Sequence, residues 1–162
     1  MKTLYIVRHA KSSWEDPLLD DFSRPLNDRG KRDAPRMAKR LKEKRVTPNL
    51  MLTSPARRAL ATCKRMAEVL GYSEDKIKMD RGLYHLNEDE ILGVIKTVKD
   101  KHDSLMIFGH NPSLTNFVNA LGTLHLDNVP TCGVAAFELP IDSWSELAFG
   151  IGKLIFYDYP KS

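Results

Sequence analysis

The feature that most constrains the fold is a short apolar run near the N-terminus, Leu4 to Val7, which an Arg-His pair follows at once. Four consecutive residues that are aromatic, β-branched or leucine predict a strand buried on both faces, as inside a parallel sheet. Open α/β sheets bind their ligands just beyond the carboxyl ends of such strands. Arg8 and His9 are therefore expected at a ligand-binding edge, where a fixed cation and a nitrogen nucleophile suit a phosphoryl group.

Two further apolar runs end in the same way. Leu50 to Thr53 precedes Ser54-Pro55-Ala56-Arg57-Arg58, and Leu105 to Phe108 precedes Gly109-His110-Asn111-Pro112. An Arg-His pair alone is common and can be an ordinary surface feature. Three buried strands that each bring a cationic or imidazole side chain to the mouth of a loop are hard to explain by packing, so we expect their ends to form one site.

The composition is that of an ordinary globular protein. The chain has 162 residues, 42% hydrophobic and 28% charged, which predicts one domain over residues 1–162. The net charge of +4 suits an anionic substrate and does not by itself indicate nucleic acid. Cys63 and Cys132 lie among apolar neighbours, which predicts buried free thiols in a reducing compartment. No apolar run approaches the ~20 residues of a membrane span or forms a secretory signal, so a cytoplasmic protein without membrane contact is expected.

Periodicity and turn residues divide the chain into alternating strands and helices. After a long polar loop, Asn27 is predicted to cap a helix that starts at Asp28. Ser54 as N-cap and Pro55 as first residue predict a second helix, a third follows Asn87, and a fourth has Pro112 in its first turn. Two late strands, 134–139 and 147–157, complete the chain. The expected class is α/β, a three-layer sandwich with a mostly parallel central sheet and helices on both faces.

The predicted first helix, residues 28–45, carries the one strong charge feature. Against the two acidic residues Asp33 and Glu43 it carries nine basic residues: Arg29, Lys31, Arg32, Arg36, Lys39, Arg40, Lys42, Lys44 and Arg45. Such a run is commonly a solvated helix face. The alternatives are a docking surface for an acidic protein and, less favoured, for nucleic acid.

Three motifs in order resemble the histidine phosphatase superfamily, which includes the cofactor-dependent phosphoglycerate mutases. They are Arg8-His9-Ala10, then Ser54-Pro55 with Arg58-Ala59 and Thr62, then Gly109-His110-Asn111-Pro112. The stretches RHAKSSW, SRPLNDRG, LTSPARRALAT and GHNPSLTNFV are similar to its small SixA-type phosphohistidine phosphatase branch. The resemblance runs from Thr3 to about Phe156 and implies a phosphoglycerate mutase-like fold.

The resemblance also implies roles for individual residues. His9 would be the nucleophile of a covalent phosphohistidine intermediate, and Arg8, Arg58 and His110 would hold the phosphoryl group. Arg58 matches the motif better than its neighbour Arg57, because it stands directly before an alanine; Thr62 is expected to position Arg58 or to pack. Asn111 is expected to orient His110 or its loop. Further candidates for phosphate or substrate binding, with ordinary surface roles as the alternative, are Lys11, Ser12 and Arg24.

Two absences bear on the chemistry. The sequence has no metal-binding signature, and arginines beside the two histidines would repel a cation, so we expect a metal-independent phosphatase without a cofactor. Larger members of the superfamily carry a carboxylate after the second helix and a long insertion over the site. Here Gly82 to His85 contains no acid, Glu88 to Glu90 are expected to cap a helix, and only about thirty residues separate Gly71 from the third strand. A cap-less, open site without an evident general acid is expected.

These absences favour phosphohistidine on a protein, such as a histidine-phosphotransfer domain in signalling, over a sugar phosphate. An imidazole leaving group can take its proton from solvent, whereas an alkoxide needs a general acid. A cap-less phosphatase of a small phosphomonoester is the alternative, with His85 or an acid of the 16–21 loop as its proton donor. A non-catalytic binding module for acidic partners is a third possibility, and the intact set of Arg8, His9, Arg58 and His110 argues against it.

Overall fold

The computed structural model describes residues 1–84 and 87–161. Within them the strands are β1 (Lys2–Arg8), β2 (Leu50–Thr53), β3 (Lys78–Met79), β4 (Ser104–Gly109), β5 (Val134–Leu139) and β6 (Lys153–Asp158). The α-helices are α1 (Asp28–Glu43), α2 (Arg57–Leu70), α3 (Glu88–Lys96) and α4 (Ser113–Gly122). Short 3₁₀ helices are η1 (Asp21–Ser23), η2 (Glu74–Lys76), η3 (Arg81–Leu83) and η4 (Trp144–Glu146).

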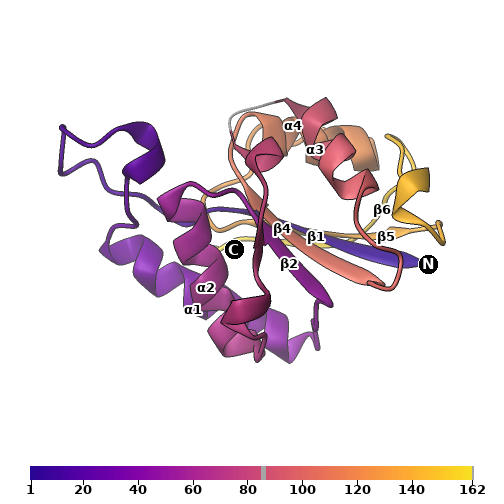
Figure 1. Ribbon diagram of the computed structural model, residues 1–162, viewed down its shortest axis with the longest axis horizontal. Coiled ribbons are helices and arrows are strands. Elements are labelled where there is room, and N and C mark those ends of the chain that lie inside the picture. Colours follow the sequence, from indigo (N-terminus) through magenta and orange to yellow (C-terminus); the bar gives the residue numbers. More distant parts are fainter. Residues whose placement is uncertain (85–86, 162) are drawn as a thin grey trace.

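One sheet runs through the molecule in the order β3-β2-β4-β1-β5-β6. The first four strands of this order are parallel, whereas β5 and β6 are antiparallel to their neighbours. Helices α1 and α2 cover one face and α3 and α4 the other (Figure 1). The expected α/β sandwich with a mostly parallel sheet is therefore confirmed, and the antiparallel pairs, β1 with β5 and β5 with β6, lie on the β6 side of the sheet.

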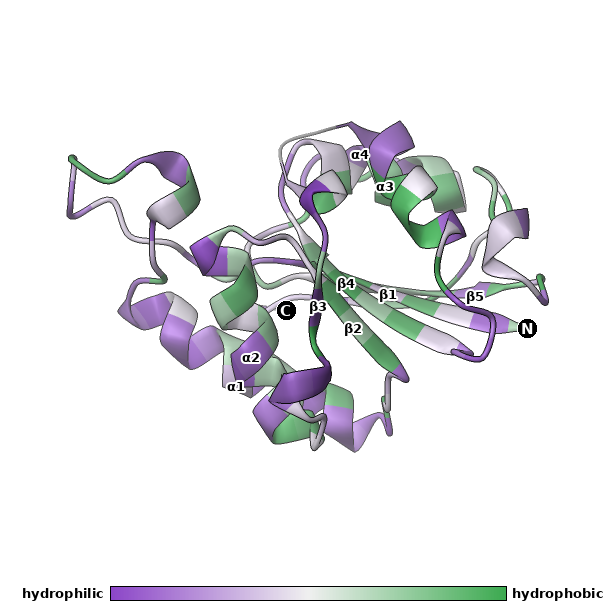
Figure 2. Ribbon diagram, viewed as in Figure 1, coloured by the Kyte–Doolittle hydropathy of each residue, from purple (hydrophilic) through white to green (hydrophobic). Residues whose placement is uncertain are grey.

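The central strands are apolar throughout because they bury side chains on both faces. On β1, Leu4 and Ile6 pack into the core beneath α3 and α4, whereas Val7 packs into the core beneath α1 and α2. On β4, Ile107 and Phe108 divide between the two cores in the same way. Figure 2 shows the apolar central strands between the helices, with polar and apolar residues alternating along α1 and α2.

The structure corrects several predicted boundaries. Helix α2 starts at Arg57 with Ala56 as its N-cap, whereas Ser54 Oγ accepts a hydrogen bond from the Ala56 amide (3.2 Å) in the preceding turn. Pro112 is the N-cap of α4 and not part of its first turn. The last strand covers 153–158 instead of 147–157, because the chain makes a left-handed turn at Gly150 (φ 88°) before it enters the sheet. The two-residue edge strand β3 was not predicted.

Helix α1 begins at Asp28 as predicted. Three of the basic residues on its charged face form ion pairs. The Asn27 side chain accepts a hydrogen bond from the Gly30 amide (2.8 Å) and caps the helix. Asp33 is buried, and Arg29 and Arg36 lie within ion-pair distance of its carboxylate (3.4 and 3.7 Å). The Arg40 guanidinium binds the C-terminal segment: Asp158 Oδ1 (3.2 Å) and the carbonyls of Tyr159 (2.9 Å) and Pro160 (3.0 Å).

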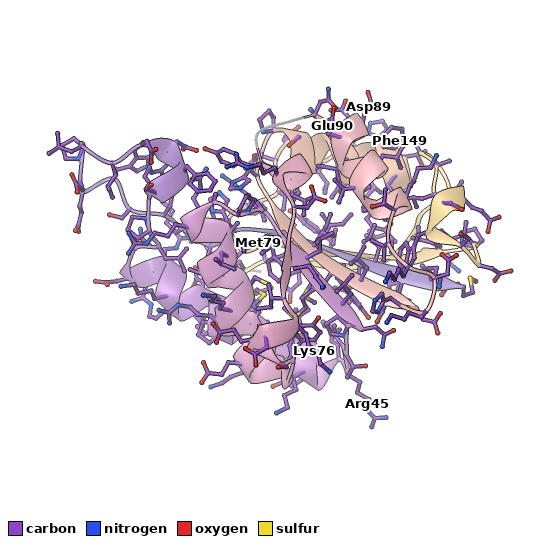
Figure 3. The ribbon with its side chains drawn as sticks, in the orientation of Figure 1. Arg45, Lys76, Met79, Asp89, Glu90 and Phe149 are labelled. Carbon is purple, nitrogen blue, oxygen red and sulfur yellow. The ribbon has the colours of Figure 1, made fainter. Side chains whose placement is uncertain are left out.

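The other basic residues of the 28–45 stretch are exposed. They are Lys31, Arg32, Lys39, Lys42, Lys44 and Arg45, and Arg36 is exposed as well. Figure 3 shows the Arg45 side chain extending away from the body of the molecule. In the described part of the chain, no helix has the length and apolar character needed to span a membrane. Cys63 and Cys132 are buried free cysteines, as predicted.

Candidate active site

The carboxyl ends of β1, β4 and β2 meet at one edge of the sheet, and hydrogen bonds fix the residues that follow them. The His9 amide donates to the Gly109 carbonyl (3.2 Å) and joins β1 to β4. The Ser54 amide donates to the Phe108 carbonyl (3.0 Å) and joins β2 to β4. The three motifs predicted to converge are therefore adjacent in space.

A loop between α4 and β5 supports this edge from the side of β1. The Cys132 amide donates to the carbonyls of Arg8 (3.1 Å) and His9 (3.0 Å). The Val129 carbonyl accepts from Arg8 Nη1 (2.9 Å) and from Asn111 Nδ2 (3.0 Å). Asn111 thereby ties the loop after β4 to the loop before β5, which agrees with its expected orienting role.

A cavity of about 270 Å³ opens at this edge, and every residue nominated from the sequence lines it. Those eight residues are Arg8, His9, Lys11, Ser12, Arg24, Arg58, His110 and Asn111. Three lining residues that the sequence analysis did not nominate as site residues are Trp14, Asp21 and Thr131. The structure thus brings the candidates together around one space, large enough for a phosphoryl group and part of its leaving group.

His9 is held as a neutral imidazole with a defined tautomer. Its Nδ1 lies 2.7 Å from the Ala10 carbonyl oxygen, and a carbonyl only accepts, so Nδ1 carries the proton and Nε2 the lone pair. Burial lowers the pKa of His9 to about 3; the Ala10 hydrogen bond opposes this shift, and the charges of Arg58, Arg8 and Arg24 add to it. A neutral ring whose Nε2 lone pair is available is the form a nucleophile requires.

Arg8 and Arg58 supply positive charge to the cavity from two different elements. Arg58 is 3% exposed at the start of α2, where the helix end also favours an anion. Arg8 ends β1, and its Nε is a buried donor without a hydrogen-bond partner in the described structure. Burial and the nearby Arg58 lower the pKa of Arg8. Arg8 is half-buried and Arg58 is buried, and a bound dianion stabilises two like charges held close together in this way.

His110 lies beside His9. The two ring centroids are 5.1 Å apart, and His110 Nε2 is 2.8 Å from Ser54 Oγ. His110 is 2% exposed, so its ring is fixed by packing as well as by the hydroxyl. Ser54, predicted as a helix cap, instead positions this second histidine.

Thr62 connects the two halves of the site. Its hydroxyl donates to the Arg58 carbonyl (2.7 Å) and accepts from the Ala10 amide (2.9 Å). The side chain is fully buried and does not line the cavity. Thr62 therefore fixes α2 against the residue after His9; it packs as expected, and its contact to Arg58 is to the backbone and not to the guanidinium.

The loop after β1 folds back over the cavity through Arg24. Arg24 is buried, and its Nε donates to the Ser13 carbonyl (3.1 Å), its Nη1 to Asp21 Oδ1 (3.0 Å) and its Nη2 to Ser12 Oγ. The guanidinium also stacks on the Trp14 ring, 3.3 Å from its centroid. Arg24 and Ser12 thus shape the loop in addition to lining the cavity, whereas Lys11 is an exposed cation at its rim.

Asp21 also lines the cavity, and the sequence pattern did not single it out from the other acids of the 16–21 loop. It is the first residue of η1. Oδ2 of its carboxylate accepts hydrogen bonds from Arg58 Nη2 (3.0 Å) and from the Tyr84 hydroxyl (2.8 Å). Its backbone carbonyl accepts from Arg58 Nη1 (2.6 Å). The 16–21 loop, considered from the sequence as an alternative source of an acid, therefore places one carboxylate in the cavity. The other candidate donor named for that role, His85, lies outside the described residues.

The acidic residues after η3 do not contribute to the cavity. Glu88, Asp89 and Glu90 form the first turn of α3, which the Asn87 side chain caps through the Glu90 amide (3.0 Å). Figure 3 shows Asp89 and Glu90 at the outer end of this helix. They stabilise the helix terminus, as expected. Among the described residues, no cluster of three or more His, Cys, Asp or Glu side chains could hold a metal ion.

A parallel α/β sheet edge with a neutral histidine, a second histidine and buried arginines defines a protein that handles phosphoryl groups. The family model of the histidine phosphatase superfamily (branch 1) matches residues 4–114, and the chain belongs to this superfamily. An uncharacterised chloroplastic protein of Arabidopsis thaliana is 29% identical over 153 residues, which cover 90% of this chain and 70% of that protein.

Solved structures share the whole architecture. A protein of Agrobacterium tumefaciens assigned as the phosphohistidine phosphatase SixA is 25% identical, with a TM-score of 0.82 and coverage of 98% of both chains. A tungstate complex of the protein histidine phosphatase SixA has a TM-score of 0.83 at 20% identity, covering 98% of this chain and 97% of that one. The phosphoglycerate mutase-like fold expected from the motifs is thus confirmed.

Proposed function

We propose that this protein is a phosphatase that acts through a phosphohistidine intermediate on His9 and removes phosphate from phosphohistidine on a protein. The observation that carries the proposal is the state of His9. Its Nδ1–H is held by the Ala10 carbonyl, its pKa is lowered to about 3, and Arg8, Arg24 and Arg58 line the same cavity. A neutral imidazole in a cationic, phosphate-sized cavity is a nucleophile matched to phosphorus.

In the first step, the arginines bind the dianionic phosphoryl group and spread its charge as Nε2 attacks phosphorus. Arg8 and Arg58 offer forked donors that match phosphate oxygens, and His110 adds a third group beside His9. The new P–Nε2 bond forms while the bond to the leaving group breaks. In the second step, water attacks phosphorus, the P–Nε2 bond breaks and inorganic phosphate leaves, which returns His9 to its neutral form.

Phosphohistidine on a protein fits this site because an imidazole is a good leaving group once its ring carries a proton. Solved structures with a similar architecture include proteins described as phosphohistidine phosphatases, one of them in complex with the oxyanion tungstate. A histidine-phosphotransfer domain is the class of partner that we propose as substrate.

A phosphatase of a small phosphomonoester is the second candidate, and one observation favours it: the Asp21 carboxylate lines the cavity. An ester needs a proton donor for its alkoxide. However, Asp21 accepts hydrogen bonds from two guanidinium groups and a tyrosine hydroxyl. These contacts suit an ionised carboxylate, which has no proton to give.

The test compares kcat/KM for a phosphohistidine peptide or domain with kcat/KM for phosphoserine and a sugar phosphate. We expect the phosphohistidine value to exceed the ester values by at least about 100-fold, the lower end of what general acid catalysis contributes to ester cleavage. Equal or higher values for the esters would reject phosphohistidine as the substrate and favour the second candidate.

A further inference from the structure

We propose that Asp21 determines the substrate class of this site by binding the ring N–H of the phosphorylated imidazole of the substrate. This inference rests on the proposed function and adds to it a residue that selects P–N over P–O bonds. Asp21 belongs to the loop after β1, lines the same cavity as His9, and is held there by neighbours from three segments of the chain.

The position of the carboxylate is fixed from several directions. Arg58 from α2 binds both the Asp21 carbonyl oxygen (2.6 Å) and its Oδ2 (3.0 Å). Arg24 binds Oδ1 (3.0 Å), and the Tyr84 hydroxyl donates to Oδ2 (2.8 Å). Asp20 Oδ1 caps η1 by accepting from the Ser23 amide (3.0 Å), which fixes the backbone on which Asp21 stands. A side chain held in this way keeps its carboxylate at one place in the site.

A carboxylate at this place serves a nitrogen leaving group better than an oxygen leaving group. An alkoxide must receive a proton, which an ionised carboxylate lacks. Phosphohistidine instead carries its proton on the second ring nitrogen, and an adjacent carboxylate favours that charged form of the ring. Asp21 would thus keep the substrate ring protonated and the P–N bond ready to break.

The phosphoryl group is then transferred from the imidazole of the substrate to the imidazole of His9. The substrate ring begins as a cation, phosphorylated on one nitrogen and bonded through its other N–H to Asp21. As Nε2 of His9 forms its bond to phosphorus, the P–N electron pair returns to the substrate ring, which leaves as neutral imidazole with its N–H still on Asp21. His9 becomes the phosphorylated cation, with its Nδ1–H still on the Ala10 carbonyl. No other proton moves in this step.

The experiment measures kcat/KM of the Asp21→Asn variant on three substrates. These are a phosphohistidine peptide, phosphoserine, and p-nitrophenyl phosphate, whose leaving group departs without a proton. Asp16→Asn is the matched control, because Asp16 lies in the same loop and does not line the cavity. Inhibition by vanadate reports whether the phosphate site is intact in each variant, and Asp21→Ser is the second variant, for use if Asp21→Asn fails to fold.

We expect Asp21→Asn to lower kcat/KM for phosphohistidine by at least about tenfold relative to p-nitrophenyl phosphate, the range lost with a hydrogen bond to a charged group. Vanadate inhibition should change by less than about threefold, and Asp16→Asn should leave all the values near wild type. Three results would overturn the inference: no change; an equal fall for all substrates and vanadate, which would mean that Asp21 only positions Arg58; or a selective fall for phosphoserine, which would identify a general acid.

The pH dependence of kcat/KM distinguishes binding of the substrate ring from a purely structural role of Asp21, because a structural role would not shift it. Without the carboxylate, the substrate ring loses its proton at lower pH, so the alkaline limb of kcat/KM for phosphohistidine should shift to lower pH. Other charged or titratable groups facing this position, all retained in the variant, are Arg24, Arg58, Tyr84, Arg8, Lys11, His9 and His110. An unshifted alkaline limb would contradict the inference. If the wild-type protein does not hydrolyse phosphohistidine at all, the proposed function fails first, before any variant is compared.

Discussion

At the scale of single residues, His9 depends on its burial and on one backbone contact. Both act on the ring in ways that a titration can follow. Burial lowers its pKa to about 3, and the Ala10 carbonyl selects the Nδ1–H tautomer. The lone pair on Nε2 is therefore present throughout the neutral and mildly acidic range.

We predict that His9 stays neutral from pH 8 to pH 4. The ¹⁵N shifts of its imidazole should show a protonated Nδ1 and an unprotonated Nε2 across this range. An unfolded chain takes up a proton at this residue below its ordinary pKa of 6.5, so this histidine lowers the free energy of unfolding as pH falls from 6.5 toward 3. Protonation of Nε2 near pH 6.5 would contradict this description of the nucleophile.

The two adjacent arginines of α2 make a matched pair for mutagenesis. Arg58 is buried and lines the cavity, whereas Arg57 is exposed and has one long contact, to the Ser23 carbonyl (3.5 Å). Arg58→Ala should raise the inhibition constant of vanadate by about 10- to 100-fold, as expected for hydrogen bonds to a charged ligand. Arg57→Ala should change it little. A larger effect at Arg57 would reverse the assignment made from the motif.

The sequence predicted the site residues whose position is set by the strand that they follow. Arg8, His9 and His110 directly follow apolar runs, so the edge of a parallel sheet predicts where they meet. Asp21 follows no such run: contacts to Arg58 and to Tyr84, which is 63 residues away, fix its position. Nothing in the local pattern distinguishes it from the other acids of the loop.

At the scale of elements, the loop after β1 and the start of α1 form one packed unit. The Asn27 amide donates to the Lys11 carbonyl (3.0 Å), and a bridge pairs Ser12 with Leu26, so the loop closes on itself at its base. Gly30, in the first turn of α1, packs against the backbone of Lys11. Figure 1 shows the rest of the loop projecting from the body beyond the ends of the strands.

Gly30 and Gly93 are expected to respond in opposite ways to the same substitution. A Cβ at Gly30 would overlap the Lys11 carbonyl oxygen, so Gly30→Ala should destabilise the fold and weaken vanadate binding at the adjacent cavity. Gly93 in α3 has open space around its Cβ position, so Gly93→Ala should stabilise by about 1 kcal/mol through helix propensity. Urea unfolding measures both changes. Equal effects would show that the loop does not pack closely on α1.

Elements with a clear periodicity of apolar residues were predicted from the sequence, whereas elements that depend on tertiary contacts were not. The apolar face of α1 and its Asn27 cap follow from local sequence. By contrast, β3 has only two residues, both exposed, and exists because it pairs with Leu52 and Thr53 of β2. Helix α2 starts later than predicted because Ser54 does not cap it. Ser54 instead hydrogen-bonds to His110 and to the turn before the helix.

At the scale of the whole molecule, four cationic side chains of the described structure (Arg8, Lys11, Arg24 and Arg58) line the cavity together with two histidines at the sheet edge. Such an environment attracts anions and disfavours a metal cation. Activity should therefore survive prolonged treatment with a chelator and should not rise when divalent ions are added back. Loss of activity on chelation that a divalent ion restores would contradict the metal-independent mechanism.

The central claim, a covalent phosphoryl group on His9, is tested most directly by rapid quenching during turnover of a ³²P-labelled phosphohistidine peptide. We predict a label on the protein that is stable to alkali, is released by acid, and maps to the peptide containing His9. His9→Ala should show neither label nor turnover while still binding vanadate through Arg8 and Arg58. Turnover by the His9→Ala variant, or a label that maps to His110, would contradict the account.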